Sequence, residues 1–119
     1  MSEVLIVDDS KLMRITIEKY LKKMGHNVIA TASDGLEAME YFEKFHPKIV
    51  TLDLTLPEKD GFECLEEMIK KDENVQVIVI SAIKDVKTRM HLLNSGATEY
   101  LVKPLNEETF VSAVNRVKQ

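Results

Sequence analysis

The sequence has little of what would staple a chain covalently or hold it in a membrane. It contains one cysteine, Cys64, and therefore no internal disulfide and no cysteine cluster for a metal ion. Such a chain suits a reducing compartment, so we expect a cytoplasmic protein. The longest unbroken apolar run, Val77 to Ile80, is far too short to cross a membrane. A predicted strand begins at Val4, which leaves no room for a signal peptide.

An excess of positive charge and a linker are also lacking. Sixteen basic and twenty acidic residues give a formal net charge of −4, which argues against a nucleic-acid or membrane surface built on bulk positive charge. Only three prolines and four glycines occur in 119 residues, and no Pro/Gly-rich stretch divides them. We therefore expect a single domain over residues 1–119.

Short apolar runs alternate with amphipathic segments along the chain. Most of the runs are β-branched and nearly continuous, which is typical of strands covered on both faces. The predicted strands are Val4–Val7, Val28–Ala32, Ile49–Leu52, Val75–Ile80 and Tyr100–Val102.

The segments between these strands have apolar residues at helical spacing. Three of them open with a capping residue, namely Asp34, Asp60 and Asn106. In the segment before Gly96 we expect Val86, Met90 and Leu93 to face inward.

Five strands that alternate with five helices predict βαβ units and a parallel sheet. The predicted fold is an α/β, doubly wound (βα)5 domain. Periodicity alone does not give the strand order, but 2-1-3-4-5 is common for such a sheet, with the ligand crevice at the carboxyl ends of strands 1 and 3.

Polar side chains follow each buried strand at its carboxyl end, where ligands bind in such sheets. Asp8 and Asp9 follow the first strand, and Asp53 follows the third. Ser81 ends the fourth strand and Lys103 follows the fifth. We expect three carboxylates, a hydroxyl and an ammonium at one edge.

Three carboxylates within about 5 Å of one another would repel strongly, by roughly 3 kcal/mol for each pair. Such a cost is large beside the ~5–15 kcal/mol stability of a small domain. A Mg²⁺ ion, which prefers oxygen ligands, would offset it, and Lys103 would offset part of the rest.

The simpler alternative is that these aspartates only cap helices. For Asp9 this alternative is as good as the metal role, because aspartate is a common cap. For Asp53 it is poorer, since Asp60 stands closer to the next helix.

A metal ion beside a free carboxylate, a lysine and a hydroxyl suits phosphoryl transfer. A carboxylate can itself be the nucleophile and form an aspartyl phosphate. Asp53 stands alone on its strand and is the candidate for that role.

These residues carry a resemblance to a known family. The chain resembles the receiver domain of two-component response regulators, most closely the single-domain, CheY-like type, and the resemblance implies a flavodoxin-like fold. It covers the whole chain in order and spacing, through Val4–Ser10, Asp53, Pro57, Asp60-Gly61, Ser81-Ala82, Gly96-Ala97 and Lys103-Pro104.

The resemblance implies that Asp53 accepts a phosphoryl group from the phosphohistidine of a kinase. Asp9 and Asp53 would bind Mg²⁺ directly together with the backbone carbonyl of Thr55, and Asp8 would bind it mainly through water. The protein would then be a switch that assists its own phosphorylation, and not an enzyme with a separate substrate.

The resemblance also implies how the signal leaves the site. Ser81 and Lys103 would each contact a phosphate oxygen, the Lys103-Pro104 peptide would be cis, and Tyr100 would turn inward as Ser81 moves. The output surface would be formed by the fourth helix, the fifth strand and the fifth helix. Its candidate contact residues are Lys87, Met90, His91, Glu99 and Tyr100.

Two positions depart from the commonest family pattern and bear on rate. Thr55 stands two residues after Asp53, and Ile83 stands two residues after Ser81. In the family these positions flank the phosphoryl group and tune its hydrolysis. An apolar Ile83 cannot orient water, so we expect slow self-dephosphorylation and a role for a separate phosphatase.

The expected partners are a sensor histidine kinase of the chemotaxis type and a target such as the flagellar motor switch. We expect a monomer with no direct contact to nucleic acid or membrane. Lys11, Arg14 and Lys19 on the first helix would suit a partner with acidic residues.

Other assignments stay open. The chain could be the receiver of a larger transcriptional regulator or a phosphorelay intermediate, although its end at Val117-Lys118-Gln119 without a linker favours a complete protein. A Mg²⁺-dependent aspartyl-phosphate phosphatase is a remote alternative, because Thr55 cannot act as its general acid. A flavin or nucleotide carrier is disfavoured, since Asp8 and Asp9 would repel a phosphate.

Overall fold

Each predicted strand is present and is followed by a helix in the computed structural model, which describes residues 2–117. The strands are β1 (Glu3–Val7), β2 (Asn27–Ala32), β3 (Ile49–Leu52), β4 (Gln76–Ser81) and β5 (Glu99–Val102). The helices are α1 (Lys11–Lys23), α2 (Gly35–Phe45), α3 (Gly61–Lys71), α4 (Val86–Asn94) and α5 (Glu107–Arg116). Residues 1, 118 and 119 of the predicted domain lie outside the described residues.

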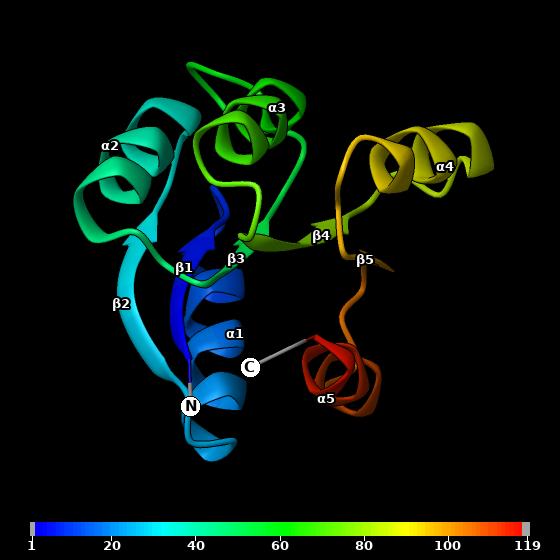
Figure 1. The fold of residues 1–119 in the computed structure, drawn as a ribbon. Helices are drawn as coiled ribbons and strands as arrows, with labels where there is room; N and C mark the ends of the chain where they lie inside the picture. Colours follow the sequence, from blue (N-terminus) through cyan, green and yellow to red (C-terminus); the bar gives the residue numbers. More distant parts are fainter. Residues whose placement is uncertain (1, 118–119) are drawn as a thin grey trace.

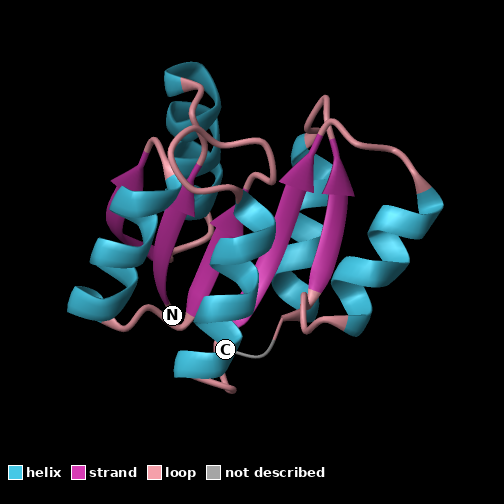
Figure 2. Cartoon of the chain, turned by 90° about the horizontal axis from the view of Figure 1, so that it is seen from above, coloured by secondary structure: helices cyan, strands magenta, loops and turns pink. Residues whose placement is uncertain are grey.

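The strands form one parallel sheet in the order β2-β1-β3-β4-β5, which confirms the predicted fold class and strand order. In the view of Figure 1, α2, α3 and α4 lie above the sheet and α1 and α5 lie below it. Figure 2 shows the five strands side by side beneath the first of these layers. Val7 is in register with both Ala32 of β2 and Leu52 of β3, so β1 and β3 end at the same level.

Both faces of the sheet are buried, each in its own apolar layer. Leu5 and Val7 of β1 pack toward α2, α3 and α4, whereas Val4 and Ile6 pack toward α1 and α5. Side chains on a strand alternate between the two faces, so a strand covered on both sides must be apolar throughout. This double burial is the reason that the strands read as continuous apolar runs.

Side-chain caps open every helix of the described chain. Asp34, Asp60 and Asn106 each accept a hydrogen bond from the backbone three residues on, as predicted. The sequence reading did not identify Ser10 as the cap of α1 or Asp85 as the cap of α4.

The predicted inward face of α4 is wrong for Val86 and Met90 but correct for Leu93, which packs against the buried apolar layer. The side chains of Val86 and Met90 are 69% and 53% exposed, and the buried residue is Leu92. Leu92 joins the apolar layer, with Leu93 packed beside it. Helical spacing alone cannot distinguish an apolar face that packs on the sheet from one left in solvent.

The helices are too short for a membrane. Within residues 2–117 none is long and apolar enough to span a bilayer, and the longest, α1, has 13 residues.

The Thr51 hydroxyl is the basis of a stability prediction. Thr51 of β3 is 1% exposed, and its Oγ1 has no hydrogen-bond partner within residues 2–117. A buried hydroxyl without a partner loses its bonds to water and gains none. We expect Thr51→Val, which keeps the shape, to raise the free energy of unfolding by about 1 kcal/mol in urea denaturation. Thr51→Ser keeps the hydroxyl and removes a methyl group, so it should lower stability; a lower stability for the valine variant would contradict the argument.

Candidate functional site

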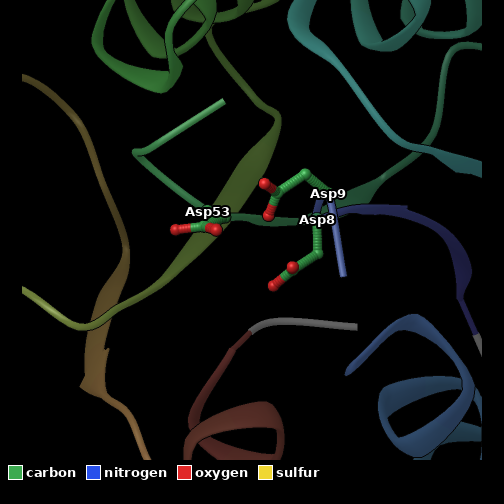
Figure 3. Close-up of side chains that lie close together, drawn as sticks. All are labelled: Asp8, Asp9 and Asp53. Atoms are coloured by element: carbon green, nitrogen blue, oxygen red, sulfur yellow. The ribbon is translucent and has the colours of Figure 1, made fainter. Parts of the chain in front are cut away.

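Three aspartates meet at the carboxyl ends of two neighbouring strands. Asp8 and Asp9 follow β1, and Asp53 follows β3. Each offers one carboxylate oxygen within 4.8 Å of the other two (Figure 3). Asp8 and Asp53 are buried, with 1% and 5% of their surfaces exposed, whereas Asp9 is exposed. The edge therefore combines two buried acids with one that faces solvent.

Helix capping does not account for these aspartates. Ser10 caps α1, because its hydroxyl accepts a hydrogen bond from the backbone nitrogen of Met13 at 3.2 Å. Asp60 caps α3 in the same manner, through Glu63. Asp9 caps no helix, so the alternative that gave it only a capping role is excluded.

Asp8 is held firmly by its neighbours. Its Oδ1 accepts a hydrogen bond from the backbone nitrogen of Ser10 at 2.9 Å. Its own backbone nitrogen donates to the carbonyl of Ala32 at 3.0 Å, which extends the β1–β2 pairing by one residue. A third contact, which sequence reasoning missed, joins the guanidinium of Arg14 to the Asp8 carbonyl oxygen at 2.8 Å.

Lys103 is the ammonium that the acids share. Its Nζ lies 2.9 Å from Oδ2 of Asp8 and 3.3 Å from Oδ2 of Asp53. The backbone nitrogen of Lys103 donates to the carbonyl of Ser81 at 2.8 Å, and the Lys103-Pro104 peptide is cis, as the resemblance implied. Burial alone would lower the pKa of Lys103, but the bond and charge of Asp8, followed by Asp53, raise it overall.

The electrostatics of Asp53 follow from its position. Burial raises the pKa of the Asp53 carboxyl above its usual value, because the charged form loses water. The Lys103 ammonium opposes that effect, and the negative charge of Asp8 adds to it. One ammonium against three carboxylates leaves the edge short of positive charge.

A glycine at the start of α3 fixes the end of β3. Gly61 begins α3, and its nitrogen donates to the carbonyl of Leu54 at 2.9 Å. A Cβ at this position would collide with the backbone oxygen of Asp53, so only glycine lets α3 start so close to that residue. The third helix therefore supports the strand end from which the Asp53 side chain leaves.

Ser81 and Tyr100 meet at the backbone of Ile83. Ser81 is fully buried, and its Oγ accepts a hydrogen bond from the backbone nitrogen of Ile83 at 3.1 Å. The Tyr100 hydroxyl donates to the carbonyl oxygen of the same residue at 2.8 Å. Both hydroxyls hold the β4–α4 loop through one residue. Tyr100 is 7% exposed, so its ring is already turned inward.

The two expected rate-tuning residues flank the edge from different loops. Thr55 is exposed, and its backbone nitrogen donates to Oδ1 of Asp53 at 3.4 Å. Ile83 is partly buried against the apolar layer under α2, α3 and α4.

Most of the expected output residues lie on the surface. Lys87, Met90 and His91 of α4 are exposed. Glu99 of β5 is partly buried and forms an ion pair with Arg116 of α5 at 2.8 Å. Tyr100 is not part of the exposed output surface, because its ring lies in the core and its hydroxyl donates a hydrogen bond to the carbonyl oxygen of Ile83.

The donor set fits a hard divalent cation. Mg²⁺ binds to one or two protein carboxylates and keeps several waters, which suits a cluster with two buried members and one open to solvent. Lys103 neutralises part of the charge, and the exposed Asp9 opens the cluster to solvent. Asp8, Asp9 and Asp53 are the side chains that could hold the ion.

Comparisons with known proteins agree with this geometry. A family model described as the response regulator receiver domain matches residues 4–115. The chemotaxis protein CheY of Thermotoga maritima is 36% identical over 116 residues, which cover 98% of this chain and 97% of that protein. A protein of Guillardia theta named as a probable transcriptional regulator (ycf27) is 38% identical, over 97% of this chain and 44% of its own length.

A solved structure is similar over nearly the whole chain. It is a chain of the CheX–CheY–BeF3–Mg²⁺ complex from Borrelia burgdorferi, with a TM-score of 0.94 and 37% sequence identity. The similarity covers 97% of this chain and 87% of that one.

The crowded carboxylates make a prediction for the metal-free protein. Asp53→Asn removes one buried charge and its repulsion with Asp8, while Lys103 keeps its shorter contact to Asp8. We expect the free energy of unfolding without Mg²⁺ to rise by on the order of 1 kcal/mol, and Tm by several degrees.

The matched control is Glu40→Gln, which removes one exposed charge from α2 and should leave Tm unchanged. Added Mg²⁺ should raise the Tm of the unsubstituted chain more than that of Asp53→Asn. A lower Tm for Asp53→Asn in the absence of metal would contradict the argument, because the lost contact with Lys103 would then outweigh the relief of repulsion.

Proposed function

The chain belongs to the response regulator receiver domain family, and from that premise we propose that it is a two-component signalling switch phosphorylated on Asp53. The observation that carries this proposal is the position of Asp53 at the end of β3. Its buried carboxylate contacts Lys103 at 3.3 Å and lies within 4.8 Å of Asp8 and Asp9. Such an arrangement joins a nucleophile, a cation site and a fixed ammonium.

The proposed step is transfer of a phosphoryl group from a phosphohistidine. A carboxylate oxygen of Asp53 attacks phosphorus and forms the new P–O bond, while the P–N bond breaks and the histidine nitrogen leaves with its electron pair. Bound Mg²⁺ would supply positive charge to the phosphoryl oxygens. Asp8, Asp9 and Asp53, with the backbone carbonyl of Thr55, would hold it. Lys103 supplies a second positive charge that is already at the acceptor.

Phosphorylation would then change the contacts of Ser81. A phosphoryl group adds about −1.5 to −2 charges and three acceptor oxygens, which favour any nearby donor. A Ser81 side chain that moves to donate its hydroxyl to the phosphate would alter the bond that its Oγ now accepts from the backbone nitrogen of Ile83. The Tyr100 hydroxyl also bonds to Ile83, at its carbonyl oxygen, so a shift of Ile83 couples the side chains of Ser81 and Tyr100. This coupling carries the signal toward α4, β5 and α5.

The output proposed here is chemotaxis. Support comes from the chemotaxis proteins among the chain's relatives, since CheY of Thermotoga maritima is 36% identical and the similar Borrelia burgdorferi structure is a CheX–CheY complex. The kinase would be of the chemotaxis type, and the target would be a protein such as the flagellar motor switch. The chain would bind this target in the cytoplasm, as a monomer. The exposed Lys87, Met90 and His91 on α4 would contact that target.

A receiver role in transcription is the second candidate. The observation that favours this role is the 38% identity to the Guillardia theta protein, which is named as a probable transcriptional regulator. The chemistry at Asp53 would be the same, and only the target would differ.

The first test is phosphorylation itself. We expect incubation with acetyl phosphate and Mg²⁺ to add one phosphoryl group, ~80 Da by intact mass. The gain should require Mg²⁺ and vanish in Asp53→Asn. Asp60→Asn is the matched control, because asparagine also caps α3 and should leave the gain unchanged. An adduct that persists in Asp53→Asn would place the phosphoryl group on another residue.

The second test concerns its lifetime. Neither Ile83 nor the short Thr55 side chain is suited to orient an attacking water, so we expect slow self-dephosphorylation and a separate phosphatase. The double substitution Thr55→Asn with Ile83→Glu adds polar groups at both positions and should shorten the half-life about tenfold.

The lifetime is measured by intact mass after rapid removal of acetyl phosphate, with Ile83→Val as the conservative control. A half-life of a few seconds for the unsubstituted chain would contradict slow self-dephosphorylation.

A further inference from the structure

Arg14 contacts the site from an element that supplies none of its acids. Its Nη1 donates to the main-chain oxygen of Asp8 at 2.8 Å, and the side chain is partly buried. The last residues paired between β1 and β2 are Val7 and Ala32, so the Asp8 carbonyl lies beyond the end of the strand. A charged donor at this carbonyl forms a stronger hydrogen bond than a neutral one.

The peptide that Arg14 holds is the one that carries Asp9. The carbonyl of Asp8 and the nitrogen of Asp9 belong to one planar unit, so fixing the oxygen fixes the direction in which the chain enters Asp9. Within residues 2–117 the Asp9 carboxylate forms no hydrogen bond or ion pair of its own. Asp8 is different, because Ser10 and Lys103 hold its two carboxylate oxygens. The position of Asp9 therefore depends on its backbone.

The place of Arg14 in α1 is otherwise unfavourable for a cation. The first turn of α1 has no acidic residue, and the helix dipole disfavours positive charge near this end. The backbone nitrogen of Arg14 donates to the carbonyl of the cap residue Ser10 at 3.0 Å, which fixes the base of the side chain. Side chains on a helix lean toward its N-terminus, so the guanidinium reaches back to the strand end.

We infer that Arg14 is a positioning residue for the cation site, holding the Asp8–Asp9 peptide so that Asp9 joins Asp8 and Asp53. This inference rests on the proposed function, because it assumes that the three acids bind Mg²⁺. Within residues 2–117 Arg14 forms no ion pair with Asp8, Asp9 or Asp53, so it would act through the Asp8–Asp9 peptide and not as a ligand. Groups that orient metal ligands typically change metal affinity by roughly 10–100-fold when removed.

The test is the affinity for Mg²⁺ alone, measured by calorimetric titration on the full chain. We expect Arg14→Met to weaken binding by roughly tenfold or more. Lys11→Met is the matched control, since it removes one positive charge from an exposed residue in the same turn, and it should change affinity less than about twofold. Removal of a positive charge by itself strengthens the binding of a cation, so an equal gain in affinity for the two variants would reduce the role of Arg14 to net charge and overturn the inference.

Affinity unchanged in Arg14→Met would overturn it as well. Thermal unfolding without metal shows whether each variant is folded. If Arg14→Met is not folded, Arg14→Lys is compared with Lys11→Met by the same criterion, because lysine keeps the charge and loses the planar fork. Failure of the unsubstituted chain to bind Mg²⁺ would refute the proposed function itself. Mg²⁺ binding that is insensitive to Arg14 would refute only the positioning role.

Discussion

Repulsion among three carboxylates is the constraint on which the rest of the site depends. The register of β1 with β3 brings Asp8, Asp9 and Asp53 to one level, and burial of two of them removes the water that would weaken the repulsion. An excess of negative charge of this kind is tolerable only where a positive group compensates it. The Lys103 ammonium compensates part of it in the metal-free chain. The negative charge that remains uncompensated favours binding of a cation, and a bound cation permits phosphoryl chemistry.

The frame around the site is rigid because it is assembled from apolar layers that the site does not interrupt. Both faces of the sheet are sealed by helices, and the acids stand just beyond the last apolar residues of β1 and β3. Close packing of α3 against the backbone of Asp53 removes the freedom that a strand end normally has. Stability and chemistry thus occupy adjacent but separate parts of the same strands.

The sequence predicts the parts of this protein that depend on local pattern. Apolar runs gave the strands, alternation with helices gave the parallel sheet, and the polar residues at strand ends gave the acids and Lys103. The features that the sequence does not predict depend on side-chain contacts between residues on different elements of the fold. Leu92 could not be distinguished from Met90 without knowing where α4 rests on the sheet. The contact of Arg14 with the Asp8 carbonyl left only an indirect signal, a cation in a helix turn that disfavours one.

The link between Ser81 and Tyr100 is made through the peptide groups of Ile83 and not through its side chain. Any residue with a backbone N–H and carbonyl can hold that link, so its chemical identity is free to vary. Evolution could therefore adjust how long the phosphorylated state lasts by changing residue 83, while the message passed to Tyr100 stays the same. Proline is the exception, because it has no N–H to offer Ser81. The lifetime of the phosphorylated state and the transmission of the signal to Tyr100 are thereby separate traits, although both depend on residue 83.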